Sequence, residues 1–125
     1  MISDVISIGH DICLIDRFEP LLYREAFLKT IFGDEELNQA ESRNQYKSQY
    51  LAGSWVAKES LSKAFGLGIF DWYLPDAQWL HSQQKGGRMW FFTETCGLNP
   101  RGYIVKTSVS YESNLASAVT IVLKS

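Results

Sequence analysis

Apolar residues follow two different spacings along this chain. β-branched and apolar residues fill the short segment 4–11, which predicts a strand that ends at Gly9. Similar runs predict four more strands, at residues 77–81, 89–93, 103–110 and 116–123. Turn residues separate these strands in pairs, with Gly86-Gly87 in the first pair and Glu112-Ser113-Asn114 in the second. The second half of the chain is therefore expected to form antiparallel strands.

Helical spacing fills the region between the first strand and the others. Pro20 suits the first turn of a helix over residues 21–31, which Gly33 closes. Asp34 is expected to cap a second helix, and the two glutamates after it lie where the helix dipole favours acidic groups. A third helix is predicted from about Ser48 to Phe65.

The third helix is apolar around most of its circumference at about 100° per residue, so we expect it to be buried on most sides. Gly66 and Gly68 end it. One strand, three helices and then antiparallel strands indicate an α+β fold, with an antiparallel sheet packed against helices and one long central helix. The length of 125 residues predicts a single domain over residues 1–125.

Composition excludes several classes of protein. Hydrophobic residues make up 46% of the chain, which excludes a disordered, collagen-like or disulfide-scaffold protein. Nothing approaches the roughly 18 consecutive apolar residues that a membrane span needs. Asp4 and Asp11 interrupt the N-terminal stretch, so no signal peptide is expected. Cys13 and Cys96 are far apart and are expected to be free thiols in a reducing cytoplasm.

The formal net charge of −2 is unevenly distributed. Residues 1–42 carry three basic and nine acidic side chains, whereas residues 43–125 carry nine basic and five acidic ones. A small anionic ligand could use the second part. No basic block is dense enough to indicate nucleic acid. An ordinary mixed surface is the simpler interpretation of charge alone.

The third helix and the first strand carry the candidate chemistry. Glu59 and Lys63 share one helix face at i and i+4, where an ordinary surface ion pair is the simplest interpretation. The apolar neighbours favour a functional role, because a half-buried carboxylate needs a partner or a metal. Asp11, just past the predicted strand, is either a polar residue at a strand exit or the second carboxylate of a Mg²⁺ site.

Gly66 and Gly68 have two interpretations as well. They either end the helix or let the backbone approach a ligand closely. A helix C-terminus is the wrong end for a phosphate site based on the helix dipole. Lys63 would therefore supply the positive charge that the helix dipole cannot supply at this end.

Three segments, in this order, make up a recognisable combination. They are Gly9-His-Asp-Ile-Cys-Leu-Ile-Asp-Arg-Phe, then Leu51-Ala-Gly-Ser-Trp-Val-Ala-Lys-Glu-Ser-Leu-Ser-Lys-Ala-Phe-Gly-Leu-Gly-Ile, and finally Thr107-Ser-Val-Ser-Tyr-Glu with Ala116-Ser-Ala-Val. Together they resemble holo-acyl-carrier-protein synthase, the small single-domain class of 4′-phosphopantetheinyl transferases. The resemblance covers almost the whole chain and implies the fold of that class.

The resemblance also implies an activity. It is the transfer of the phosphopantetheine arm of coenzyme A to a serine of apo-acyl carrier protein, with release of adenosine 3′,5′-bisphosphate. By matching residues, the resemblance implies Asp11 and Glu59 as Mg²⁺ ligands and Lys63 as the residue that neutralises the diphosphate. It implies Gly66, Gly68 and Ser108 as part of the coenzyme A site. It implies Arg17 and Arg24 as docking residues for the carrier protein. The resemblance further implies a homotrimer with active sites between subunits.

Several positions depart from the pattern of the class. Tyr111 replaces a histidine that is a candidate general base, and a tyrosine with a pKa of about 10 is a poor base near neutral pH. Glu112 is then a candidate base or ligand, or a solvated turn residue, and a metal-bound water is another route. Lys106 replaces a second histidine and either contacts a phosphate or points outward. Ser54 stands where the class has arginine, and the Gly-Lys-Pro stretch of the class becomes Gly87-Arg88-Met89 here.

These departures indicate a divergent member that serves a dedicated carrier protein in place of general fatty acid biosynthesis, or a weakened enzyme. The alternative from another class is an inactive relative that binds coenzyme A or a carrier protein. Tyr111 favours that alternative, and the retained Asp11, Glu59 and Lys63 disfavour it. A purely structural subunit would leave these residues unexplained.

Overall fold

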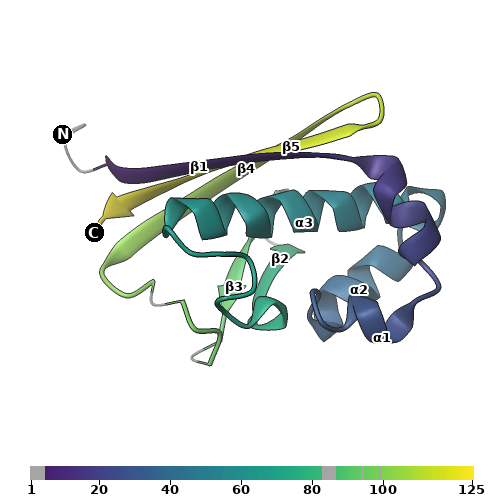
Figure 1. The fold of residues 1–125 in the computed structure, drawn as a ribbon, viewed down its shortest axis with the longest axis horizontal. Coiled ribbons are helices and arrows are strands. Elements are labelled where there is room, and N and C mark those ends of the chain that lie inside the picture. The colour runs from purple at the N-terminus through teal and green to yellow at the C-terminus, as the bar shows by residue number, and fades with distance from the viewer. Residues whose placement is uncertain (1–4, 83–86, 94, 99) are drawn as a thin grey trace.

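The computed structural model describes residues 5–82, 87–93, 95–98 and 100–125. One strand comes first, then the helices, then four strands, as predicted (Figure 1). The strands are β1 (Val5–Leu14), β2 (Ala77–His81), β3 (Arg88–Phe92), β4 (Tyr103–Glu112) and β5 (Leu115–Lys124). The helices are α1 (Glu25–Leu28), α2 (Asp34–Glu41) and α3 (Lys47–Ala64), with short 3₁₀ helices η2 (Ile15–Leu21), η3 (Asn44–Tyr46) and η4 (Leu74–Asp76).

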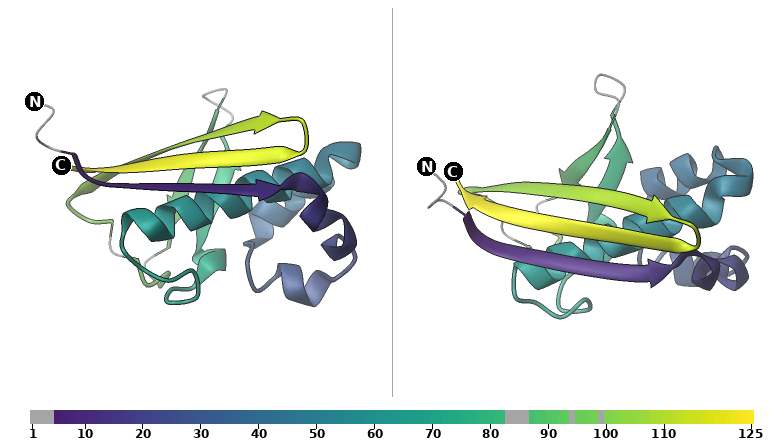
Figure 2. Two further views of the ribbon diagram at one scale, coloured as in Figure 1. Left: turned by 45° about the horizontal axis from the view of Figure 1, so that its top comes forward. Right: turned by 90° about the horizontal axis from the view of Figure 1, so that it is seen from above.

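The strands form two antiparallel sheets, one in the order β1-β5-β4 and the other a β2-β3 ribbon. In the larger sheet, Asp11 on β1 lies opposite Ala118 on β5, which lies opposite Val109 on β4. α3 runs along one face of this sheet, and Figure 2 shows no described element over the other face. β1 and β4 are thus the two edges of the sheet, with β5 between them.

α3 forms the centre of the core, as its apolar pattern predicts. Leu51, Val56 and Leu61 have no exposed surface. Phe18 and Phe32 pack beside the helix, with 6.1 Å between their ring centroids. Because a helix buried on most sides cannot shift without opening the core, α3 is a rigid support for the polar side chains that it carries.

The first strand does not end at Gly9 as predicted, because β1 continues to Leu14. Cys13 still lies opposite Ala116 on β5, and both are buried. Gly9 is inside the strand because α3 passes against its backbone. A Cβ there would lie 2.0 Å from the Ser60 carbonyl oxygen. This glycine marks a close approach between two elements.

The helix predicted over residues 21–31 is also wrong in its extent. The segment forms η2, with Pro20 inside it near its end, and the single-turn helix α1. η2 ends one residue after Pro20, and the chain turns over residues 22–24 before α1 begins, so the two short helices do not join into one. Gly33, and not Asp34, is the N-cap of α2, and its N–H donates to Oε1 of Glu36 at 3.0 Å.

The remaining elements follow the sequence closely. α3 begins and ends one residue before the predicted limits, and β2 matches residues 77–81. Ser113 turns the chain between β4 and β5 with a positive φ of 50°. Gly86 of the other predicted turn lies outside the described residues. Within the described residues, no helix combines the length and the apolar character needed to cross a membrane.

Candidate active site

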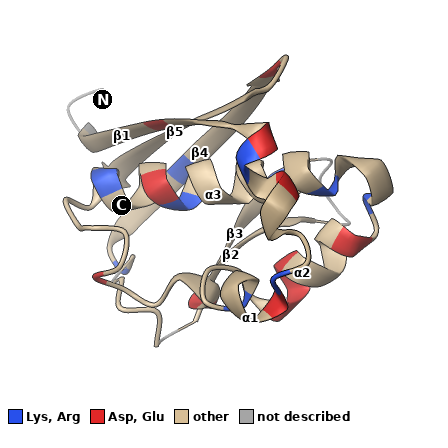
Figure 3. Cartoon of the chain, turned by 45° about the vertical axis from the view of Figure 1, so that its right-hand side comes forward, with Lys and Arg blue, Asp and Glu red and all other residues tan. Residues whose placement is uncertain are grey.

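β1 lies against the C-terminal half of α3, and this contact brings Asp11 to Lys63. The Ser7 hydroxyl donates to the Ala64 carbonyl and ties the start of β1 to the end of α3. Nζ of Lys63 donates to Oδ1 of Asp11 at 3.1 Å and to the carbonyl of His10 at 2.9 Å. Lys63 therefore forms its ion pair with the strand, and Figure 3 shows acidic and basic positions side by side in this region of α3 and β1.

Glu59 lies one helical turn before Lys63 and is partly buried. Burial raises the pKa of Glu59, and the nearby Asp11 carboxylate raises it further. Lys63 and Arg17 act in the opposite direction, because their positive charges favour the ionised carboxylate. Two carboxylates from different elements therefore share one electrostatic site with two cationic side chains.

The site has the donor chemistry of a hard divalent cation. Mg²⁺ prefers oxygen ligands and usually takes one or two carboxylates, with water and substrate phosphates filling its other positions. Asp11 and Glu59 supply two carboxylates, and their mutual repulsion falls when a cation lies between them. Among the described residues, no group of three or more His, Cys, Asp or Glu side chains could hold a metal ion. The residues thus fit a cation that also uses substrate oxygens.

Gly66 and Gly68 follow Lys63 at the end of α3. Gly66 has a φ of +69°, the left-handed conformation that ends many helices, so the helix-ending role is confirmed. The Gly68 N–H donates to Oδ2 of Asp71 at 2.7 Å. Both glycines are exposed at the same end of α3 as Lys63. Their contact with coenzyme A stays a prediction.

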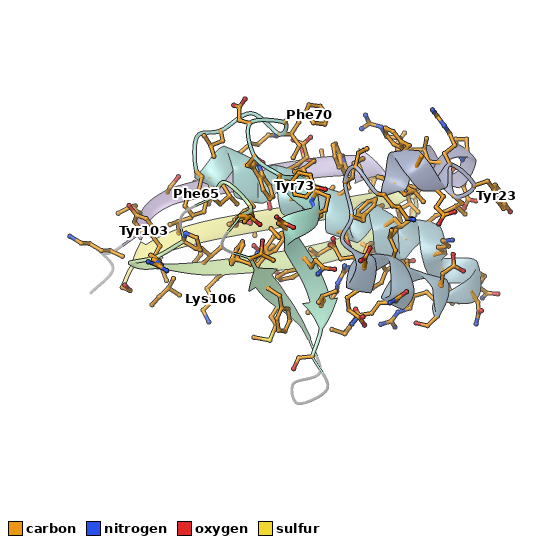
Figure 4. All side chains as sticks on the ribbon, turned by 90° about the horizontal axis from the view of Figure 1, so that it is seen from below. Tyr23, Phe65, Phe70, Tyr73, Tyr103 and Lys106 are labelled. Carbon is orange, nitrogen blue, oxygen red and sulfur yellow. The ribbon has the colours of Figure 1, made fainter. Side chains whose placement is uncertain are left out.

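Arg17 and Glu59 line an apolar groove of about 310 Å³. Its other walls are Phe18, Leu21, Phe27, Ile31, Trp55, Ile69 and Phe70. The Arg24 guanidinium lies over the Phe27 ring, 5.4 Å from its centroid. Figure 4 shows Phe70 and Tyr23 projecting from the body of the protein, and Phe70 is 79% exposed. Both predicted docking arginines therefore border an apolar surface beside Glu59.

The other predicted residues lie on β4. Tyr111 and Glu112 end this strand, Ser108 is exposed, and Figure 4 shows Lys106 extending into solvent. The Tyr111 hydroxyl lies against Gly53, where an added Cβ would be 1.9 Å from it. Gly53 is six residues before Glu59, or about 9 Å along the helix axis.

Within one chain, therefore, the predicted site residues form two sets. Asp11, Glu59 and Lys63 lie at the β1 edge of the sheet, together with Arg17 and the two glycines. The residues of β4 lie at the opposite edge, with β5 between them. Adjacent strands are about 4.8 Å apart, so the two edges are separated by about 10 Å. A single chain does not bring the two sets together.

The residues of β4 border a second hollow, which we call the cationic pocket. It has a volume of about 610 Å³ and lies between α3, β4 and the β2-β3 ribbon. Arg43, Tyr46, Gln49, Tyr50, Trp79, His81, Gly87, Arg88, Thr107, Ser108, Val109 and Tyr111 line it. Burial raises the pKa of Tyr50 to about 12, so this lining hydroxyl is neutral at pH 7. The pocket is thus bordered by cations and by neutral polar groups.

One buried ion pair was not anticipated from the sequence. Nζ of Lys58 lies 2.9 Å from Oε1 of Glu36, and neither side chain is exposed. Lys58 also donates to the carbonyls of Leu74 and Ala77, and the Trp79 N–H donates to Glu36. The sequence signal for a buried ion pair was the presence of Lys58 in a helix that is apolar around most of its circumference. The pair joins α2, α3 and β2.

Comparison with known proteins identifies the class. A family model described as the 4′-phosphopantetheinyl transferase superfamily matches residues 7–111. The chain belongs to this superfamily. Within it, the chain is 31% identical over 123 residues to a holo-[acyl-carrier-protein] synthase of Fusobacterium nucleatum, which covers 95% of this chain and 99% of that protein. The resemblance inferred from the motifs is confirmed.

Solved structures agree with this assignment. The crystal structure of a holo-(acyl-carrier-protein) synthase from Bacillus anthracis, in complex with coenzyme A (3′,5′-ADP), is 26% identical with a TM-score of 0.80, over 97% of this chain and 98% of that one. The holo-[acyl-carrier-protein] synthase of Neisseria meningitidis is 26% identical with a TM-score of 0.79, over 96% and 99%. The predicted α+β fold is therefore confirmed.

Proposed function

We propose that this chain transfers the 4′-phosphopantetheine arm of coenzyme A to a serine of an apo-acyl carrier protein. The serine Oγ attacks the β-phosphorus of coenzyme A and forms a phosphodiester. The bond from that phosphorus to the bridging oxygen breaks, adenosine 3′,5′-bisphosphate leaves, and the serine proton passes to a base. The observation that carries the proposal is that Asp11, Glu59 and Lys63 lie together in a chain that matches such a synthase over 95% of its length.

In this proposal, Asp11 and Glu59 hold Mg²⁺. When bound there, the ion would neutralise the charge that develops on the diphosphate during the transfer. Lys63, already beside Asp11 at 3.1 Å, adds a second positive charge at the same place. Gly66 and Gly68 leave the end of α3 open to the donor, since neither carries a side chain.

Two chains would be needed to complete the site, and we propose a homotrimer. The outer face of the β1-β5-β4 sheet carries apolar side chains that water covers in a single chain, among them Ile6, Ile8, Ile12, Leu14 and Ile104 at 42–65% exposure. Contiguous exposed apolar surface of this kind marks protein interfaces. Packing of a second copy on this face would bring the β4 edge of one chain near the β1 edge of the next.

The donor would then lie between subunits, with Lys63, Gly66 and Gly68 from one chain and Lys106 and Ser108 from its neighbour. Burial raises the pKa of Tyr111, so its hydroxyl stays protonated near pH 7. Tyr111 accordingly acts as a hydrogen-bond donor, and Glu112 or a water takes the proton. In this proposal, Tyr111 and the proton acceptor together take over the role of the histidine that the class carries at position 111.

The apolar groove beside Glu59 fits the carrier protein. Arg17 and Arg24 border a surface that carries Phe27 and Phe70, which suits an acidic helix with an apolar face. The serine of a protein docked there would lie close to Glu59. We also propose a cytoplasmic location, because Cys13 and Cys96 are free thiols.

Intact-mass spectrometry tests the proposal. The chain is incubated with an apo-acyl carrier protein, coenzyme A and Mg²⁺, and the expected result is a gain of one phosphopantetheine per carrier protein. No gain on any of several carrier proteins overturns the transfer activity. Tyr111 favours one second candidate, a binding module. Coenzyme A binding in a calorimeter without any transfer would support that candidate.

A further inference from the structure

Three hydroxyl groups lie among apolar side chains between α3 and the β1-β5-β4 sheet. They belong to Ser60 on α3, Thr120 on β5 and Thr107 on β4. Oγ of Ser60 is 2.7 Å from Oγ1 of Thr120, which is 2.6 Å from Oγ1 of Thr107. Ser60 and Thr120 have no exposed surface. A buried hydroxyl is costly unless it is hydrogen-bonded, and these three groups satisfy one another.

The two ends of this series of hydroxyls fix the direction of every hydrogen bond in it. At one end the indole N–H of Trp90, on β3, can only donate, and it donates to Thr107 at 2.8 Å. At the other end the Ala57 carbonyl can only accept, and Ser60 donates to it at 2.8 Å. Each hydroxyl has one hydrogen, so Thr107 donates to Thr120 and Thr120 donates to Ser60. We call this series the hydroxyl network. It contains no acid or base, so it orients its members and does not carry protons.

The hydroxyl network holds α3 at the point where β1 touches it. Thr120 is the register partner of Gly9 on β1 and of Thr107 on β4, so the three residues form one row across the sheet. Gly9 lies against the Ser60 carbonyl, and Thr120 hydrogen-bonds the Ser60 hydroxyl. Two neighbouring strands therefore hold one residue of α3, one at its backbone and the other at its side chain.

This attachment point is next to the candidate cation site. Glu59 precedes Ser60 on α3, and Asp11 follows Gly9 by two residues, on the same face of the sheet. A helix that slides along the sheet changes the distance between these two carboxylates. A slide of one residue moves a helix by about 1.5 Å and would break the hydroxyl contacts, since O–H···O bonds extend to about 3.0 Å. The hydrogen bond between Ser60 and Thr120 thus fixes where α3 presents Glu59 to Asp11.

We propose that Thr120 is a positioning residue, which acts through Ser60 to set the register of α3 on the sheet and holds Glu59 at the distance from Asp11 that a divalent cation requires. Apolar packing has no direction, whereas a hydrogen bond weakens steeply with distance and angle, so the network defines the register more narrowly than packing alone. The proposal rests on the transfer function proposed above. It assigns a role in cation binding to a side chain that lies inside the protein.

Binding of Mn²⁺, used as a probe of the cation site and followed by electron paramagnetic resonance, tests the proposal without the transfer reaction. Thr120→Val keeps the shape of the side chain and removes its hydroxyl, so Ser60 loses its donor and Thr107 its acceptor. We expect this variant to bind Mn²⁺ more weakly by about 5-fold or more. It should also need more Mg²⁺ for half-maximal transfer, with a smaller change in KM for coenzyme A. Wild-type Mn²⁺ affinity in Thr120→Val overturns the proposal.

Ser62→Ala is the matched control, because it removes a buried serine hydroxyl of α3 that is outside the hydroxyl network. Ser62 accepts from the Trp72 indole at 2.6 Å and donates to the Lys58 carbonyl at 3.0 Å. Both variants should be less stable in urea unfolding, but only Thr120→Val should bind Mn²⁺ more weakly. Equal weakening of Mn²⁺ binding in both would reflect a general loss of stability and would overturn the proposal.

Two more variants separate positioning from folding. Thr120→Ser keeps a hydroxyl and is expected to restore most of the Mn²⁺ affinity, and a failure of this rescue contradicts the role of the hydroxyl. Should Thr120→Val fail to fold, Ser60→Ala breaks the same hydrogen bond from the helix and decides by the same measurement. A wild type that binds Mn²⁺ without any transfer refutes the transfer function and leaves the Mn²⁺ test decisive. A wild type that binds no Mn²⁺ overturns the cation site and this proposal with it.

Discussion

Replacement of Gly9 by alanine tests how the candidate active site is held together. In the folded chain, a Cβ on residue 9 would lie 2.0 Å from the Ser60 carbonyl oxygen and 2.6 Å from the Ala64 nitrogen. Both are backbone atoms of α3, so neither can rotate away as a side chain would. Real Cβ atoms do not approach other heavy atoms closer than 3.0 Å, so β1 has to move about 1 Å from the helix.

This shift has two expected consequences. Overpacking of this kind costs about 1–3 kcal/mol of unfolding free energy. Asp11, two residues further along β1, would move away from Lys63, with which it makes a 3.1 Å contact. Because a misplacement of about 1 Å can cost about 100-fold in rate, the transfer rate should fall about 100-fold.

Urea unfolding followed by tryptophan fluorescence measures the first effect, and carrier-protein modification measures the second. Gly87→Ala is the matched control for stability, because nothing lies within 4 Å of a Cβ at that position. It should unfold like the wild type. A Gly9→Ala protein with wild-type stability and a wild-type transfer rate would refute the reasoning about the β1–α3 contact.

Three further predictions follow from burial and exposure. Lys58→Met should cost about 3–5 kcal/mol in urea unfolding, because Glu36 is left buried without its partner, and a loss below about 1 kcal/mol would contradict this. Burial raises the pKa of Cys13 from 9.0 to about 11, so the neutral thiol contributes stability that is present below pH 9 and is lost as the pH rises to 11. Thermal unfolding as a function of pH should show this loss of stability in the wild type. The same loss in Cys13→Ala would count against Cys13 as its cause. Ile8→Glu should shift the assembly to monomers in light scattering, whereas Tyr23→Glu, at a 92% exposed side chain, should not, and an unchanged mass for Ile8→Glu would argue against the proposed interface.

Sequence patterns predicted the elements whose apolar residues repeat regularly. They did not predict the boundaries that depend on contacts with other elements. The central helix was predicted within one residue at each end, because its apolar residues repeat over five turns. The strand that continues past Gly9 was shortened in the prediction, since a glycine in a strand looks like an end until the neighbouring helix is known. The region 21–31 was predicted as one helix, because local spacing does not show that Pro20 lies in a separate 3₁₀ turn.

The candidate site was predicted in a similar way. The sequence motifs predicted Asp11, Glu59 and Lys63 as site residues, and the structure places Lys63 against Asp11. Their separation from the β4 residues could not be predicted, because it depends on the order β1-β5-β4. The contact of Arg88 with Ser54 also depends on how the β2-β3 ribbon lies against α3. Long-range register of this kind leaves no local pattern.

The central claim is that the carboxylates of β1 and α3 hold the divalent cation that the transfer uses. The most direct test is the initial rate of carrier-protein modification, measured by intact mass, as a function of Mg²⁺ concentration for the wild type and for Glu59→Gln. We predict that wild-type activity requires the cation and is lost with a chelator, and that Glu59→Gln loses most of the rate and needs far more Mg²⁺. A Glu59→Gln protein with the wild-type rate and the wild-type Mg²⁺ dependence would contradict the assignment.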